Sequence, residues 1–311
     1  MLNKIKLSLI TGIVALVVSC KNETTRLTEI KILNDYPSAS GVEYFRKKIY
    51  IIGDDANNLL ILDSNLNVTD SIQLYSFPEK RIPKTVKADL ESMTIGPNGL
   101  LLLLGSGSFV PYRNGGWLID PKTKQKDSIR FSNLYSLITA FTGIKEINVE
   151  GAAYIPGYLV LVNRGNKNHP QNHLLFIRQK YPDPQIQAIH SSLIGYSDST
   201  TFKGVSGLVY SAKSDMLICT VSTEDTRNSM DDGAIGKSYL WIVKNFSAKK
   251  KWRAINPDKI IDLDNTDSRF KGQKIESVCI LKETRKNLSL LLAADNDNGS
   301  STIFRLTVSK Y

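Results

Sequence analysis

The stretch NVEGAAYIPGYLVLVNRGN, residues 148 to 166, contains the repeated unit that decides the fold. Glu150 stands at the start of one apolar strand, and a second apolar strand ends on the polar run that begins at Asn163. Alternation and β-branched residues predict strands for both segments. If the same arrangement recurs along the chain, its polar residues will gather at one end of the fold.

Five segments share the pattern of this unit. They are residues 40–44 (SGVEY), 91–95 (ESMTI), 150–154 (EGAAY), 206–210 (SGLVY) and 276–280 (ESVCI). The first position is Ser or Glu, the second Gly or Ser, and the fifth Tyr or Ile. A second and a third apolar strand follow each segment, and a more amphipathic fourth strand closes four of the units. Self-similarity of this kind indicates a repeated four-stranded unit.

The fifth unit reaches Tyr311 after its third strand, so it lacks a fourth. Residues 27 to 33 (LTEIKIL) match the pattern of the fourth strands, such as TDSIQLY. We therefore predict an all-β fold, a five-bladed β-propeller formed by residues 27–311, in which the N-terminal strand completes the last blade. Radial repetition leaves only short, protected strand edges. Six blades, with a degenerate unit between residues 206 and 276, are the alternative.

The first nineteen residues resemble a bacterial lipoprotein signal peptide. Lys4 and Lys6 precede an apolar run too short to span a bilayer, and small residues lead to Cys20. We expect Cys20 to be lipidated and residues 20–26 to form a tether. The expected location is the bacterial cell envelope, with the protein anchored to a membrane; whether it faces the periplasm or the surface stays open.

The formal net charge is +10, and the basic residues are scattered in short runs. These runs are 46–48 (RKK), 122–126 (KTKQK) and 249–251 (KKK), and all fall where turns are expected. No basic stripe interleaved with aromatic residues appears, which excludes nucleic acid as the expected partner. Attraction to anionic lipid or to an envelope polymer suits a tethered protein better. Cys219 and Cys279 lie in apolar strands, where buried free thiols are favoured over a disulfide.

In a propeller the first strand of each blade lines the central channel, so the entry to that strand and the turn between strands two and three share one rim. Glu91, Glu150 and Glu276 should therefore ring one mouth of the channel. Such carboxylates require a cation, arginine partners or raised pKa values, and we predict that these three hold a metal ion. The residues predicted to bind a ligand on the same rim are Asp54, Asp55, Arg113, Asn163, Arg164, Glu224, Asp225, Arg227, Asp295 and Asp297.

The segments SGVEY with IYIIGDD, KADLESMTI with LLLLGSGS, and INVEGAA with VNRGN resemble the phytase-like, or "esterase-like", propeller domains of bacterial envelope proteins. The resemblance covers the blade cores over most of residues 30 to 311. It implies calcium-assisted hydrolysis of a phosphate or carboxyl ester, with Ca²⁺ as the cofactor. No G-x-S-x-G elbow occurs, which excludes a serine esterase of the α/β-hydrolase kind.

Three hypotheses follow for the carboxylate-ringed mouth. The favoured hypothesis is an envelope module that binds a polar or anionic ligand, a glycan or a protein partner without turnover. The second is the metal-dependent hydrolase that the resemblance implies. In the third, the glutamates serve the scaffold alone. No catalytic residue can be assigned, and the oligomeric state stays open.

Overall fold

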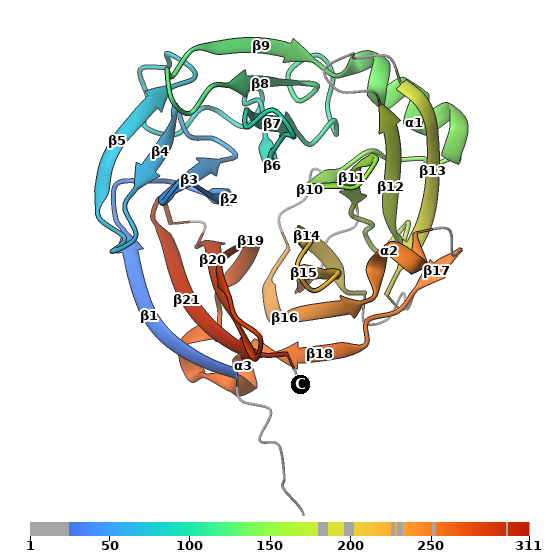
Figure 1. The fold of residues 1–311 in the computed structure, drawn as a ribbon. Coiled ribbons are helices and arrows are strands. Elements are labelled where there is room, and N and C mark those ends of the chain that lie inside the picture. The colour runs from blue at the N-terminus through green and yellow to red at the C-terminus, as the bar shows by residue number, and fades with distance from the viewer. Residues whose placement is uncertain are drawn as a thin grey trace, which may run out of the picture.

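The structure is a computed structural model that describes residues 25–179, 186–195, 202–224, 228, 233–250, 253–296 and 298–310. Five antiparallel sheets stand around a central axis (Figure 1). The predicted five-bladed propeller is confirmed, and the six-bladed alternative is wrong. The interval between residues 206 and 276 contains one blade with additional short elements.

The first two blades each follow the chain from the axis outward. Blade 1 consists of β2 (Ala39–Phe45), β3 (Lys48–Gly53), β4 (Asn58–Leu62) and β5 (Val68–Gln73). Blade 2 consists of β6 (Leu90–Ile95), β7 (Leu101–Gly105), β8 (Gly115–Ile119) and β9 (Lys126–Arg130). The inner strands therefore begin at the predicted pentads.

The third and fourth blades share additional elements. Blade 3 consists of β10 (Val149–Ile155), β11 (Tyr158–Asn163), β12 (Asn172–Gln179) and β13 (Ile186–Ile194), with β17 (Ala254–Ile255) parallel to β13 as an outer fifth strand. Blade 4 consists of β14 (Gly204–Ser211), β15 (Met216–Glu224), β16 (Ile235–Lys244) and β18 (Lys259–Asp262). The helices α2 (Phe246–Lys249) and α3 (Leu263–Thr266) and the 3₁₀ helix η1 (Ser268–Phe270) connect these strands.

The fifth blade closes the ring with both ends of the chain. It consists of β19 (Lys274–Glu283), β20 (Asn287–Asp295), β21 (Ser301–Ser309) and β1 (Thr25–Leu33). β1 is antiparallel to β21, with Ile30 opposite Phe304 and Leu33 opposite Ser301. The prediction that residues 27 to 33 supply the missing strand is confirmed (Figure 1).

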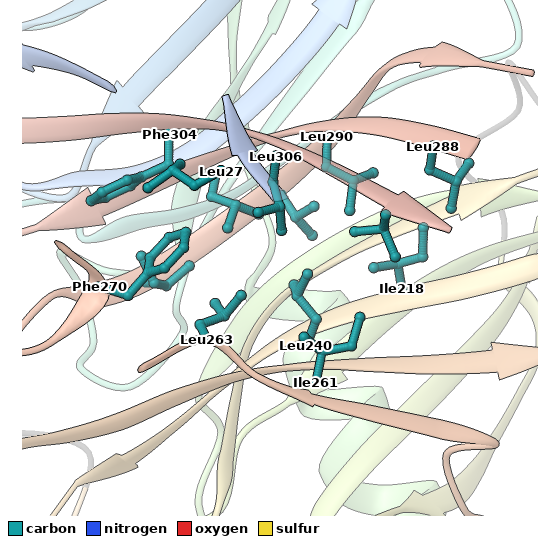
Figure 2. Packing of buried hydrophobic residues seen from close by; sticks show 14 of the residues in the cluster. Leu27, Ile218, Leu240, Ile261, Leu263, Phe270, Leu288, Leu290, Phe304 and Leu306 are labelled. Carbon is teal, nitrogen blue, oxygen red and sulfur yellow. The ribbon is translucent and has the colours of Figure 1, made fainter. Parts of the chain in front are cut away.

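The core lies between adjacent blades, because both faces of each twisted sheet are apolar. Figure 2 shows this packing where the closing blade meets blade 4. The rings of Phe270 and Phe304 have centroids 4.7 Å apart, and both side chains are fully buried. Burial of one such side chain stabilises a fold by roughly 1.5–3 kcal/mol. This packing fixes the blades, and therefore the inner strands, relative to one another.

One longer helix, α1 (Ser132–Thr142), lies between blades 2 and 3. Leu134 and Ile138 are buried, as the helical spacing predicts, and the helix ends at Gly143 with φ of 73°. Phe141, near the end of the helix, is 69% exposed. The helix is therefore a packing element whose last turn projects into solvent.

Cys219 and Cys279 are both buried free thiols, as favoured from the sequence. Within the described ranges, no helix has the length and hydrophobicity needed to cross a bilayer.

Candidate functional site: the channel mouth

Every inner strand carries a β-bulge at the first residue of its pentad. The pairing register between the first and second strands skips Ser40, Glu91, Glu150, Ser206 and Glu276 in the five blades. A bulge leaves one residue out of the ladder and re-aims its side chain. The repeat thus encodes five equivalent side chains at one end of the channel.

The two serines of this set bind the neighbouring blades. Ser40 donates a hydrogen bond to the Leu90 carbonyl at 2.5 Å, and Ser206 donates to the Ile275 carbonyl at 2.7 Å. A side chain at Gly207 would come within 2.6 Å of the Glu276 carbonyl of the next blade. The small residues of the pentads therefore permit close contact between blades.

The three glutamates lie among further charged residues from the rim. Among the described residues, the mouth contains eight carboxylates and five cations. The carboxylates are Asp54, Asp55, Asp89, Glu91, Glu150, Glu224, Glu276 and Asp295; the cations are Arg81, Lys87, Arg113, Arg164 and Lys274. The cations are too few to neutralise the carboxylates.

Lys87 and Arg113 organise the side of the mouth formed by blades 1 and 2. The Lys87 ammonium bridges Asp54 and Asp89, with 2.9 Å to Asp89. Arg113, 2% exposed, donates to Asp89 at 2.9 Å. Burial acts to raise the pKa of Asp89, but Lys87 and Arg113 hold it below its ordinary value. Burial raises the pKa of Asp54 although Lys87 opposes the shift. Asp89 is therefore the ionised partner of both cations.

Arg164 and Lys274 organise the opposite side, formed by blades 3, 4 and 5. Arg164 lies 2.9 Å from Glu224 and 3.8 Å from Glu150, and Lys274 lies 2.9 Å from Glu276. Burial raises the pKa of Glu150 to about 8, because Arg164 opposes the shift only in part. Burial also raises the pKa of Glu276 in spite of Lys274. Arg164 and Lys274 outweigh burial at Glu224 and lower its pKa.

Glu91 lies between these two groups, and its negative charge is compensated least by the neighbouring cations. No hydrogen bond or ion pair links its side chain to another residue in the described part of the chain. Burial, followed by the negative charges of Glu150 and Asp89, raises the pKa of Glu91 well above its ordinary value. Glu276 offers a further unsatisfied atom, because its Oε2 is buried and has no hydrogen-bond partner. The mouth thus contains a half-buried carboxyl group, that of Glu91, and a fully buried unsatisfied oxygen of Glu276.

The remaining predicted residues near the mouth form structural contacts. Arg81 donates to Asp55 at 2.7 Å and also interacts electrostatically with the buried Asp295. Asn163, 2% exposed, accepts a hydrogen bond from the Asn148 amide at 2.7 Å. Asn163 therefore holds the entry to β10 in place.

The arrangement bears directly on the predicted metal site. Within the described ranges, the one group of three potential metal ligands consists of Asp54, Asp89 and Glu91, whose ligand atoms lie within 4.8 Å of one another. Glu150 and Glu276 are not part of it. Lys87 already contacts two of the three carboxylates, so its ammonium supplies the positive charge that an ion would bring. These residues do not fit a resident calcium ion while Lys87 is in place.

A polar cavity of about 280 Å³ adjoins the mouth on the side of blade 3. Arg164 belongs to both, and Glu146, Asn166, His169 and His173 contribute to the lining. Asn166 donates to Glu146 at 2.7 Å, and burial lowers the pKa of His173. The cavity therefore presents amide and imidazole groups next to the charged residues of the mouth.

Several predicted residues lie outside the described part of the chain: Cys20, Asp225, Arg227 and Asp297. Among the residues that the sequence did not single out, Lys274 and Arg81 belong to the mouth. Lys274 lies two positions before Glu276, on the same face of a strand, so period-two alternation is a signal that identifies it. Arg81 comes from an irregular loop and has no such signal.

The profile of a family described as "Family of unknown function (DUF6929)" matches residues 35–308. No protein of curated function matches the chain. Glutaminyl cyclase from Myxococcus xanthus is similar in structure, with a TM-score of 0.53 and 9% identity over 92% of this chain and 97% of that one. The allergen Mala s 1 from Malassezia sympodialis gives a TM-score of 0.51 and 10% identity over 90% and 96%. Similarity at this identity concerns the fold alone.

Proposed function

We propose that this chain, which belongs to the DUF6929 family of unknown function, binds a polar ligand through a cationic group at its channel mouth. The observation that carries the proposal is the surplus of carboxylates around Glu91, a half-buried side chain with no hydrogen bond or ion pair among the described residues. An ammonium or guanidinium group would satisfy these oxygens and restore the charge balance.

The pairing of the arginines favours a cation over an anion. Arg113 contacts Asp89, and Arg164 contacts Glu224 and Glu150, so both guanidinium groups are already neutralised. An anionic ligand would have to displace these carboxylates or lie beside them. An anion would raise the pKa values of Glu91 and Glu150 further and would be repelled by either group once it is ionised. Binding of an anionic ligand, which the sequence led us to expect, is therefore less well supported than binding of a cationic group.

The cavity beside Arg164 supports a ligand larger than a simple ion. Its volume of about 280 Å³ lies near the lower end of the range for small-molecule sites. The side chains of Asn166 and His173 offer hydrogen bonds to uncharged polar groups. The ligand class that fits is a small hydrophilic molecule with one cationic end.

Calorimetry with spermidine, arginine amide and calcium chloride tests the proposal. We expect spermidine or arginine amide to bind to the propeller, and Glu91→Gln to weaken that binding about tenfold or more, because a charged hydrogen bond contributes roughly 1.5–3 kcal/mol. The matched control is Asp127→Asn. It also removes one negative charge, but from an exposed residue at the start of β9, at the end of the propeller opposite the mouth. Equal affinities of the wild-type protein and Glu91→Gln for every cation would refute the proposal.

A second candidate function is the metal-dependent hydrolase that the resemblance to phytase-like domains implies. The grouping of Asp54, Asp89 and Glu91 favours it, and Lys87 opposes it. In this case calcium would bind to the wild-type protein, Lys87→Met would tighten that binding, and hydrolysis of phosphate and sugar esters would stop on chelation. Absence of calcium binding in both proteins would exclude this function.

The sequence further supports an envelope lipoprotein anchored through Cys20. We expect the wild-type chain to fractionate with membranes and Cys20→Ala to lose the lipid mass from its N-terminal peptide. Mass spectrometry of that peptide is the measurement, and an unmodified cysteine would contradict the proposal.

A further inference from the structure

The end of the propeller opposite the mouth collects basic residues. Each inner strand starts at the mouth, so the turns between strands one and two, and between strands three and four, lie at the far end. We call this end the basic face. Its cations are Arg46, Lys47, Lys48, Lys122, Lys124, Lys126, Lys213, Lys244, Arg285, Lys286 and Lys310. The topology thus joins basic runs that are scattered in the sequence; Lys251 of the third run lies outside the described residues.

The carboxylates of the basic face are fewer and serve local structure. Asp70, which is paired with Lys124, and Asp127 belong to β5 and β9; the others, in or beside the turns, are Asp63, Asp120, Asp215, Asp258 and Glu283. Each of the latter accepts hydrogen bonds from the turns around it; for example, Asp63 accepts from the Asn67 amide at 2.9 Å, and Asp120 from the Lys122 amide at 2.7 Å. The face therefore has a net positive charge. The carboxylates of its turns are held in place by hydrogen bonds from the surrounding backbone and side chains.

A pocket of about 470 Å³ opens in this face between blades 4 and 5. Lys213, Lys244, Arg285 and Lys310 line it, together with the hydroxyl-bearing Ser214 and Thr284. The hydroxyl groups of Ser214 and Thr284 donate to Glu283 at 2.6 Å and to the Asn287 carbonyl at 3.1 Å, so the cations would make the contacts to a ligand. Four cations around one concavity fit a phosphate group, whose oxygens accept several hydrogen bonds. Lys310 is paired with Glu283, and Lys213 donates to the Glu283 carbonyl at 3.4 Å.

The chain enters the propeller beside this pocket. β1 begins at Thr25, opposite Val308 and close to Lys310 at the end of β21. Only residues 21 to 24 separate Thr25 from Cys20, and a fully extended residue spans at most about 3.6 Å. A lipid anchor at Cys20 would therefore hold the basic face within roughly 20 Å of the membrane.

We propose that the basic face binds the phosphate headgroups of an anionic membrane, with one headgroup in the pocket between blades 4 and 5. The mouth then points away from the membrane, open to ligands. The charge pattern suits this partner, since a negatively charged bilayer attracts clustered Lys and Arg. The proposal concerns a surface distinct from the mouth, so it stands independently of ligand binding there.

Vesicle flotation with residues 21–311 tests the proposal without a lipid anchor; this span contains the whole closed propeller, which begins at Thr25. We expect binding to vesicles of phosphatidylglycerol and phosphatidylcholine at about 0.1 M salt, none to phosphatidylcholine alone, and release at high salt. The triple variant Lys213→Glu, Lys244→Glu and Arg285→Glu should lower the partition coefficient at least about a hundredfold, because each cation near such a surface contributes about fivefold.

The matched control changes three basic residues toward the mouth end by the same charge: Lys80→Glu, Lys145→Glu and Lys271→Glu. We expect it to retain vesicle binding within about threefold, since these residues lie in loops at the mouth end, one strand length from the bound surface, and salt screens charges at such separations. Equal losses in both variants, or no binding of the wild-type protein to anionic vesicles, would overturn the proposal. Tight calorimetric binding of inorganic phosphate without vesicle binding would assign the pocket to a free anion and overturn it as well. If the pocket variant unfolds, the corresponding three Gln variants replace it.

Discussion

Replacement of Glu150 by glutamine should make the protein more stable at alkaline pH. The carboxyl is 7% exposed, and burial raises its pKa from 4.5 to about 8. The folded state therefore binds an additional proton between pH 4.5 and 8, and the free energy of unfolding falls as the pH rises through this window. At 1.36 kcal/mol per pKa unit, the loss above pH 8 reaches at most about 5 kcal/mol.

Glutamine has nearly the same shape and no charge, and it can accept the hydrogen bond that Asn148 donates to Glu150 at 2.7 Å. At pH 5 the buried glutamic acid is also neutral, so Glu150→Gln and the wild-type protein should have similar stabilities. At pH 8.5 the variant should be more stable by about 2–5 kcal/mol. Urea denaturation across this pH range measures the difference.

The control for this prediction is Glu283→Gln on the basic face. Hydrogen bonds from Lys310, Ser211 and Ser214 outweigh burial and lower the pKa of Glu283. This group stabilises the folded state when ionised, so its replacement should destabilise the protein at neutral pH and less so in acid. A stability difference for Glu150→Gln that does not change between pH 5 and 8.5 would refute the reasoning about the mouth.

Other predictions concern the ring and its closure. Binding of a cation at the mouth should release protons near neutral pH, because it lowers the pKa of Glu91 and Glu150; calorimetry in two buffers of different ionisation enthalpy should then give different heats, and equal heats would contradict this. Gly207→Ala should destabilise the fold by 1–3 kcal/mol in urea denaturation, because its Cβ would meet the Glu276 carbonyl at 2.6 Å; a neutral effect would show that the blades can separate. Phe304→Ala should cost about 3–5 kcal/mol, because it opens a cavity against Phe270 where the ring closes, and a change below 1 kcal/mol would contradict the tight packing.

The blade architecture could be predicted because the same sequence pattern recurs at the start of every inner strand. Apolar residues on both faces of the strands define the layers between blades, and the match of residues 27 to 33 to the fourth strands identified the closure. The addition of β17 to blade 3 was not predicted. Two residues pairing with β13 over a long sequence separation leave no periodic signal.

The mouth could be located from the sequence, but its pairings could not. Topology brings Glu91, Glu150 and Glu276 to one end, whereas the partner of each depends on loop geometry. Lys87 lies near Asp54 and Asp89 because of the course of an irregular loop, and its ammonium contacts two of the three carboxylates that could hold a metal ion. Ser40 lies at the same repeat position as Glu91 yet bonds the neighbouring blade, because its hydroxyl is short.

The central claim is that the mouth has too few cations, so that some glutamates there keep their protons near neutral pH. Carbon-13 NMR titration of glutamate carboxyl groups tests it most directly. We predict a resonance that titrates at about pH 8 and is lost in Glu150→Gln. If every glutamate carboxyl titrates below about pH 5.5, the carboxylates of the mouth are fully compensated and the claim is contradicted.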